Sequence, residues 1–131
     1  MNGDIVMKKI LIADDDQQIR NMLRITLERA EYEVVEACDG LEAVAAYKTQ
    51  AIDLVITDIV MPEKEGIELI MELKAINPRV GIIAISGGGR INPEDYLKWA
   101  RRFGVEHTFS KPVDRQKLLD AVASMLATSV T

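Results

Sequence analysis

Residues 53–58 read Asp53-Leu54-Val55-Ile56-Thr57-Asp58, a short apolar run that closes on a carboxylate. A run of this length, bounded by polar residues, predicts a strand that is buried on both faces. Earlier in the chain, Lys9-Ile10-Leu11-Ile12-Ala13 has the same form and is followed by the acids Asp14, Asp15 and Asp16. Each run therefore predicts a strand that delivers negative charge at its carboxyl end.

Two later runs end in a different polar group. Val80 to Ile85 is followed by Ser86, and a run around Thr108 and Phe109 is followed by Lys111. In an open parallel sheet, ligands bind at the carboxyl ends of the strands. The four runs together predict a site for a divalent cation and a phosphoryl group at that edge.

Helix-like segments alternate with the strand-like runs along the whole chain. Strands are predicted at residues 9–13, 33–38, 53–57, 80–85 and 107–110, with a loop at 61–66. Helical spacing of apolar residues predicts helices after the candidate N-caps Asp16 and Asp114, and over residues 41–48, 67–76 and about 92–103.

This alternation predicts an α/β fold, because right-handed crossovers place helices on both faces of one parallel sheet. We expect a single doubly wound (βα)5 domain of flavodoxin-like topology, with five parallel strands in the order 2-1-3-4-5. That order opens a crevice between the first and third strands. Asp14, Asp15 and Asp58 end those two strands and are expected to meet there.

Composition excludes several classes of protein. The chain has 131 residues, a net charge of −5 and a pI of about 4.9, so it lacks the basic footprint of a nucleic-acid binder. The N-terminus has no basic, apolar leader, and no stretch approaches the roughly 18 apolar residues of a membrane span. Cys38, the single cysteine, is interpreted as a small apolar residue near a strand end. An unpaired thiol fits a reducing compartment, so we expect a cytoplasmic protein. From its charge and hydropathy we expect no direct contact with nucleic acid or membrane.

The clustered acids predict a metal site. Two carboxylates about 4 Å apart repel by roughly 4 kcal/mol at an effective dielectric constant of about 20, so such a group takes up protons or binds a cation. Asp14, Asp15 and Asp58 offer only oxygen ligands, while His107 and Cys38 lie elsewhere in the sequence. Oxygen ligation indicates Mg²⁺, with Mn²⁺ as the alternative, rather than zinc.

Asp58 is also a candidate nucleophile. A carboxylate that attacks phosphorus forms an aspartyl phosphate. Neutralising the phosphoryl oxygens provides most of the catalysis of such transfers. Lys111 can pair with one oxygen, Ser86 can donate a hydrogen bond to another, and Gly87 leaves its backbone N–H accessible.

These motifs resemble the receiver domain of bacterial two-component response regulators over roughly residues 7–127. The matching stretches are residues 10–16, residues 53–62, Gly66, residues 83–87 and Ser110-Lys111-Pro112-Val113. The resemblance implies that Asp58 accepts a phosphoryl group from a sensor histidine kinase or a histidine phosphotransfer protein. It implies that Asp15, Asp58 and the backbone carbonyl of Val60 ligate Mg²⁺, with Asp14 acting through water.

The same resemblance implies roles for two further residues. Ser86 is expected to move onto the phosphoryl group, and Lys111 is expected to pair with it. The peptide bond between Lys111 and Pro112 is expected to be cis. The chain departs from the family where an aromatic residue is common, because that position is Thr108. Phe109 comes one residue later and should point to the opposite face of the sheet.

The resemblance implies a switch that alters partner binding and catalyses only its own phosphorylation and dephosphorylation, rather than a metabolic enzyme. We expect one receiver domain over residues 1–131, with a core of about 7–127 and no output domain. The partner that reads the switch is then a downstream protein or an output domain severed from this chain. Both a stand-alone receiver and a fragment of a longer regulator fit, as do a monomer and a phosphorylation-dependent dimer.

Two other classes of function share part of the pattern. One is a Mg²⁺-dependent phosphatase or phosphotransferase with an aspartate nucleophile, similar to the haloacid dehalogenase superfamily. That superfamily places a second Asp two residues after the nucleophile, where this chain has Val60. The other is a flavin- or nucleotide-binding domain of the same topology, which the acids crowding the crevice disfavour.

Overall fold

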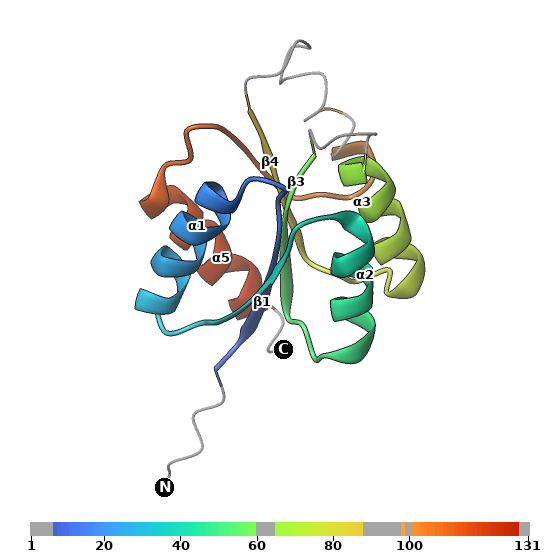
Figure 1. Ribbon diagram of the computed structural model, residues 1–131, viewed down its shortest axis with the longest axis horizontal. Coiled ribbons are helices and arrows are strands. Elements are labelled where there is room, and N and C mark those ends of the chain that lie inside the picture. Colours follow the sequence, from blue (N-terminus) through green and yellow to red (C-terminus); the bar gives the residue numbers. More distant parts are fainter. Residues whose placement is uncertain (1–6, 60–64, 88–97, 99–100, 129–131) are drawn as a thin grey trace, which may run out of the picture.

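The computed structural model describes residues 7–59, 65–87, 98 and 101–128. The chain forms a five-stranded parallel sheet in the order β2-β1-β3-β4-β5 (Figure 1). The strands are β1 (Lys9–Ala13), β2 (Glu33–Ala37), β3 (Leu54–Asp58), β4 (Ile82–Ser86) and β5 (His107–Ser110). The helices with described bounds are α1 (Gln17–Arg29), α2 (Gly40–Thr49), α3 (Glu65–Ile76) and α5 (Arg115–Thr128). The doubly wound α/β fold and its strand order confirm the prediction.

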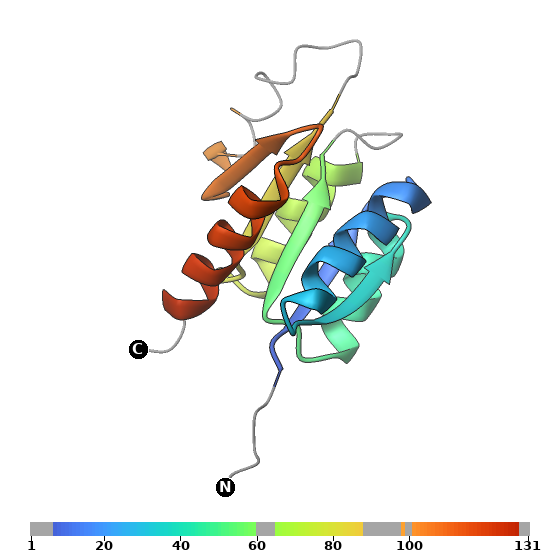
Figure 2. The same cartoon turned by 90° about the vertical axis from the view of Figure 1, so that its left-hand side faces the viewer.

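Helices cover both faces of the sheet. α1 and α5 lie on one face, and α2 and α3 lie on the other (Figures 1 and 2). Side chains alternate between the two layers along each strand, as the pleat requires. In β1, Ile10 and Ile12 pack with α1 and α5, whereas Leu11 and Ala13 pack with α2 and α3. Both layers exclude water from the sheet, which explains why β1, β3 and β4 are apolar almost throughout.

Helix caps use some of the acidic side chains that follow strands. Asp16 accepts a hydrogen bond from the Gln18 backbone N–H at 2.8 Å and so begins α1. Asp114 accepts from the Lys117 backbone N–H at 3.0 Å at the start of α5. Both predicted N-caps are confirmed, and neither carboxylate is left unengaged at the edge of the sheet.

Most predicted elements agree with the structure to within about two residues, and the main difference is the start of α3. The predicted loop at 61–66 is wrong at Glu65 and Gly66, which form the first residues of α3. Packing of Leu69, Ile70 and Leu73 into the core overrides the low helix propensity of glycine there. Cys38 lies just beyond β2, close to the strand end as predicted, and is exposed.

The helix predicted at about 92–103 lies mostly outside the described residues, although Lys98, Arg101 and Arg102 are helical. Gly104 ends that segment with a φ of 88°. None of the helices within the described ranges is both long and apolar enough to cross a lipid bilayer.

Candidate functional site

The strand order brings two acidic side chains together at the carboxyl edge of the sheet. β1 pairs with β3 in a register that sets Ala13 beside Thr57, so the next residue of each strand, Asp14 and Asp58, meet at the edge. Both are buried, with relative exposures of 1% and 3%, whereas Asp15 is exposed. One carboxylate oxygen from each of Asp14, Asp15 and Asp58 lies within 4.8 Å of the other two. The three predicted acidic residues therefore do gather.

Lys111 provides the positive charge of the site. Its Nζ lies 2.8 Å from Asp58 Oδ2 and 3.4 Å from Asp14 Oδ2. The backbone N–H of Lys111 donates to the Ser86 carbonyl at 2.8 Å, which holds the end of β5 beside the end of β4. The Lys111–Pro112 peptide bond is cis, as predicted. A single ammonium thus bridges the two buried carboxylates.

Gly87 makes room for that lysine. A Cβ placed on Gly87 would lie 2.4 Å from Lys111 Cδ and 2.8 Å from its Cβ and Cγ. Real Cβ atoms do not approach other carbons so closely. The aliphatic part of Lys111 therefore lies directly against the Gly87 backbone, a contact that the sequence did not predict.

Two buried polar atoms of the site have no hydrogen-bond partner among the described residues. One is Ser86 Oγ at the end of β4, and the other is Asp14 Oδ2, which makes an ion pair of 3.4 Å with the Lys111 ammonium but accepts no hydrogen bond. Buried polar groups in native proteins are nearly always paired, since an unpaired one costs about 1–3 kcal/mol. Two such atoms at the carboxyl edge of the sheet, one from a hydroxyl and one from a carboxylate, indicate a site built to receive a polar ligand.

Burial changes the acid–base properties of the site. The pKa of Asp14 is raised from 3.8 to about 6. Desolvation by burial is the largest cause, and the charge of Asp58 adds to it, while the hydrogen bond from the Asp16 backbone N–H and the interaction with Lys111 oppose it. Burial alone would lower the pKa of Lys111, but its hydrogen bond to Asp58 and the charges of Asp58 and Asp14 raise it overall. The lysine is therefore firmly protonated, whereas Asp14 titrates close to neutral pH.

The donor set suits a hard cation. Asp14, Asp15 and Asp58 supply oxygen atoms only, and a cation among them would occupy the vicinity of the unsatisfied Asp14 Oδ2. Val60, whose backbone carbonyl was the fourth predicted ligand, lies outside the described residues. The residues present at the end of β1 and β3 fit Mg²⁺ by their chemistry.

Sequence reasoning missed Arg20. This residue lies in the second turn of α1, and its Nη1 donates to the Asp14 backbone carbonyl at 2.6 Å. Every residue has a backbone carbonyl, so the sequence does not indicate which carbonyl an arginine side chain will bind. The spacing of four residues from the Asp16 cap was the one available hint that Arg20 faces the acidic segment.

A second group of metal-capable atoms lies at the end of β2. Cys38, Asp39 and Glu42 hold their ligand atoms within 4.8 Å of one another. These groups already bond among themselves, since Glu42 accepts from the Cys38 backbone N–H at 2.9 Å. The interaction with Glu42 also raises the pKa of the Cys38 thiol and so disfavours the thiolate that a metal would need.

Comparison with known proteins agrees with the geometry. The family model for the response regulator receiver domain matches residues 10–123. The chain is 38% identical over 120 residues to the chemotaxis protein CheY of Halobacterium salinarum, covering 91% of this chain and 97% of that protein. The chain belongs to the response regulator receiver domain family.

A solved structure supports the same assignment. The receiver domain protein of Clostridium thermocellum superposes with a TM-score of 0.85 at 30% identity, covering 94% of this chain and 97% of the other. The chain is also 37% identical to the CAI-1 autoinducer sensor kinase/phosphatase CqsS of Vibrio cholerae, but spans only 17% of that longer protein, against 89% of this chain. Receiver domains thus occur both as small proteins and as parts of large ones, and phosphoryl transfer to an aspartate is their general function.

The receiver domain departs from its family pattern at β5 in the predicted way. Phe109 packs against the layer formed by α1 and α5. Thr108 pairs with Ala84, whose side chain belongs to the opposite layer. The aromatic ring and the threonine therefore face opposite sides of the sheet, as strand alternation predicts.

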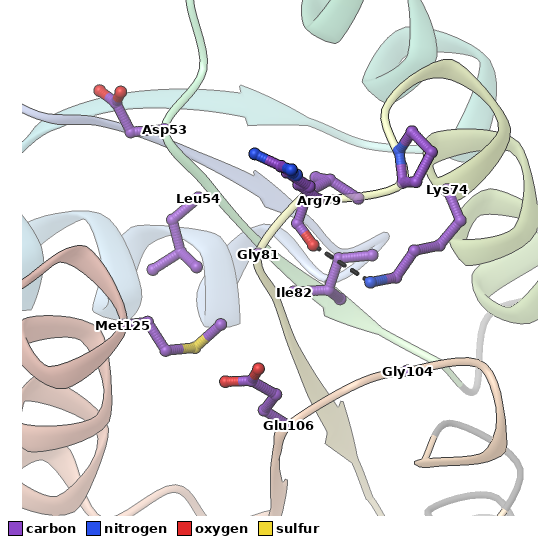
Figure 3. Close-up of a pocket in the computed structure, with 11 residues that line it drawn as sticks. Asp53, Leu54, Lys74, Arg79, Gly81, Ile82, Gly104, Glu106 and Met125 are labelled. Carbon is purple, nitrogen blue, oxygen red and sulfur yellow. Dashed lines mark hydrogen bonds between the residues drawn. The ribbon is translucent and has the colours of Figure 1, made fainter. Parts of the chain in front are cut away.

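A pocket of about 550 Å³ lies at the other edge of the sheet, away from the acidic cluster (Figure 3). Asp53, Gly81 and Glu106, each of which precedes a strand, form part of its wall together with Lys74 and Met125. None of the predicted site residues lines it. The candidate functional site and this pocket therefore lie at opposite edges of the sheet.

Proposed function

We propose that this receiver domain takes a phosphoryl group on Asp58 from a phosphohistidine of a sensor histidine kinase or a histidine phosphotransfer protein. One observation carries the proposal: Asp58 is a buried carboxylate that lies 2.8 Å from a lysine ammonium and beside two unsatisfied buried polar atoms. The sensor kinase/phosphatase CqsS of Vibrio cholerae contains a segment similar to this chain, which supports a histidine kinase as the phosphoryl donor.

The proposed step is a substitution at phosphorus. An oxygen of Asp58 forms a new P–O bond while the P–N bond of the donor phosphohistidine breaks, and the imidazole leaves with that electron pair. Before transfer, Lys111 holds the Asp58 carboxylate; afterwards its ammonium is placed to pair with a phosphoryl oxygen. Ser86, whose hydroxyl has no partner among the described residues, supplies a hydrogen bond to a second oxygen.

Asp14, Asp15 and Asp58 would hold the metal, together with the carbonyl of Val60. When bound, Mg²⁺ neutralises charge on the phosphoryl oxygens and on the carboxylates. The protein itself buries Asp14 and Asp58, which keeps them desolvated, and leaves Asp15 exposed at the mouth of the site. A cation would also offset the burial that raises the pKa of Asp14.

The phosphorylated chain then acts as a switch within one receiver domain over residues 1–131. Phosphorylation biases an existing equilibrium between two conformations, and a downstream protein or an output domain binds one of them. The exposed, unpaired Cys38 fits a reducing compartment, and we place the switch in the cytoplasm.

The test is labelling with a small acyl phosphate and Mg²⁺. The wild-type chain should gain one alkali-labile phosphoryl group, and Asp58→Asn should gain none, because the amide is not a nucleophile. Asp53→Asn is the matched control: Asp53 immediately precedes the strand that Asp58 ends, so the variant should label as wild type does.

Two outcomes would contradict the proposal. Undiminished labelling of Asp58→Asn would move the acceptor to another residue. Hydrolysis of an unrelated phosphate monoester, measured alongside, would instead identify a phosphatase, since a switch that dephosphorylates itself hydrolyses only its own aspartyl phosphate.

A further inference from the structure

Arg20 joins three parts of the molecule through one guanidinium group. Its Nη1 donates to the backbone carbonyl of Asp14 at 2.6 Å, a short charge-assisted hydrogen bond. Its Nε lies 3.2 Å from Oε1 of Glu36, which is on β2. The side chain of Arg20 is only 14% exposed, and its bond to the Asp14 carbonyl is partly buried, whereas its contact with Glu36 is open to solvent.

The contact with Asp14 fixes a peptide that carries a predicted metal ligand. The carbonyl of Asp14 and the N–H of Asp15 belong to the same planar peptide group. On the far side of Asp15, the N–H of Asp16 donates to Asp14 Oδ1 at 2.8 Å. Both peptides that flank Asp15 are therefore held, although its own carboxylate is exposed.

Glu36 orients the guanidinium for this contact. Its two carboxylate oxygens face two arginines of α1: Oε1 pairs with Arg20, and Oε2 lies 3.4 Å from Nε of Arg24. Arg24 is thus the natural comparison for Arg20. Both belong to α1 and both pair with Glu36, but no described contact of Arg24 reaches Asp14.

We infer that Arg20 is a positioning residue for the cation site: it holds the Asp14–Asp15 peptide so that both carboxylates face the cation. The inference rests on the proposed function of Asp14 and Asp15 as the metal-binding acids. Groups that orient metal ligands typically change metal affinity by about 10- to 100-fold when they are removed. We expect the low end of that range, because Arg20 acts through a single backbone carbonyl.

Electrostatic repulsion alone predicts the opposite change in Mg²⁺ affinity when Arg20 is replaced. Arg20 is a cation close to the acidic cluster, so removing its charge should strengthen Mg²⁺ binding if repulsion were its only influence. A residue that only packs α1 against the sheet should alter stability and leave Mg²⁺ affinity unchanged. The direction of the change in affinity therefore separates the three roles.

The experiment measures the Kd for Mg²⁺ by isothermal titration calorimetry in wild type, Arg20→Met, Arg20→Lys and Arg24→Met. Arg20→Met should bind Mg²⁺ about 10-fold more weakly, with Arg24→Met within about 2-fold of wild type. Arg20→Lys keeps the charge but has no fork to reach both partners, so it should also bind more weakly than wild type. Urea unfolding without Mg²⁺ should show Arg20→Met destabilised more than Arg24→Met, because Arg20 is the more buried of the two and makes an additional hydrogen bond.

Several results would overturn the inference. These are unchanged or tighter Mg²⁺ binding by Arg20→Met, an equal loss in Arg24→Met, and a wild-type chain that binds no Mg²⁺. Because calorimetry needs no phosphoryl donor, its outcome is independent of the labelling of Asp58. A chain that binds Mg²⁺ through Arg20-positioned acids but takes no label would refute the phosphoacceptor assignment alone.

Discussion

The two edges of one sheet use charged side chains in opposite ways. At the carboxyl edge, Asp14 and Asp58 are almost completely buried and share one lysine. At the amino edge, the pocket of about 550 Å³ is bordered by Asp53 and Glu106, which are both exposed (Figure 3). The pocket at the amino edge is therefore bordered by exposed acids, whereas the acids that share a lysine at the carboxyl edge are buried.

Hydrogen bonding explains the difference. At the amino edge, Asp53 Oδ2 already accepts from the Lys9 backbone N–H at 2.8 Å, and Lys74 Nζ donates to the Val80 carbonyl at 3.3 Å. Those charges tie strands and loops together. At the carboxyl edge, Asp14 Oδ2 and Ser86 Oγ are buried without a hydrogen bond among the described residues. Buried polar groups that the fold leaves unsatisfied indicate function better than the size of a pocket.

The largest expected difference in stability is between two variants that each neutralise one acid, Asp14 at the carboxyl edge and Asp53 at the amino edge. Without Mg²⁺ at pH 8, Asp14→Asn should raise the free energy of unfolding by about 3 kcal/mol, because the folded chain no longer buries an ionised carboxylate. The figure follows from a pKa raised from 3.8 to about 6, at about 1.4 kcal/mol for each factor of ten in proton affinity. Asp53→Asn changes an exposed side chain and should alter stability by about 0.5 kcal/mol or less.

The pH dependence gives the sign of this effect independently. An acid whose pKa is raised by folding binds its proton more tightly in the folded chain, so it stabilises the fold at low pH. That contribution is lost as pH rises from about 4 through about 6. The advantage of Asp14→Asn should therefore shrink toward pH 4 in urea unfolding experiments. Destabilisation of Asp14→Asn at pH 8 would show that Lys111 compensates fully for the burial of Asp14.

The two glycines that flank β4 offer a second comparison of the edges. Gly87→Ala should cost about 2 kcal/mol, as overpacking of a tight contact does, because the new methyl group overlaps the Lys111 side chain. At the amino edge, the Cβ of Gly81→Ala would lie 3.2 Å from Leu54 Cδ1 and Met125 Cε. Both are ends of flexible side chains, so this variant should remain within about 1 kcal/mol of wild type.

Titration of Lys111 by NMR shows whether Gly87→Ala displaces the lysine from Asp58 or only strains the backbone. If the alanine at position 87 moves Lys111 away from Asp58, the pKa of that lysine should fall from its raised value toward the ordinary one. Gly81→Ala should leave the titration of Lys111 as it is in wild type. An unchanged titration in Gly87→Ala would mean that the backbone, and not the lysine, moves to admit the methyl group.

The features that the sequence predicted well depend on local pattern and strand order. β1 and β5 have the predicted bounds, since apolar runs between polar residues define buried strands. The meeting of Asp14 with Asp58 follows from the strand order alone, because β1 and β3 are neighbours in it. The role of Asp16 as the cap of α1 was predicted as well, whereas the burial of Asp14 and the exposure of Asp15 emerge only from the structure.

The features that were missed depend on approach in three dimensions. The contact between Gly87 and Lys111 joins residues that follow two different strands, and no local pattern encodes it. The bond from Arg20 to the Asp14 carbonyl is invisible for a related reason, since every residue has a carbonyl. The start of α3 at Glu65 was missed because core packing decides it against local propensity.

The smallest expected effect is the response of each edge to Mg²⁺. At ten times its Kd, a ligand that binds only the folded chain raises the free energy of unfolding by about 1.4 kcal/mol. Wild type and Asp53→Asn should both gain this amount in urea unfolding at pH 8, with EDTA as the metal-free reference. Asp14→Asn should gain clearly less at the same Mg²⁺ concentration, because it has lost one of the acids that face the cation.

Two conditions make the Mg²⁺ measurement specific. NaCl at equal ionic strength controls for general screening of the acidic cluster and should produce only a small part of the gain. Lowering the pH to 5 places most of the Asp14 population in its protonated form, so protons compete with the cation and the gain should diminish. An equal gain in all three chains, or one that NaCl reproduces, would place the Mg²⁺ effect outside the acidic cluster and remove the functional distinction between the two edges.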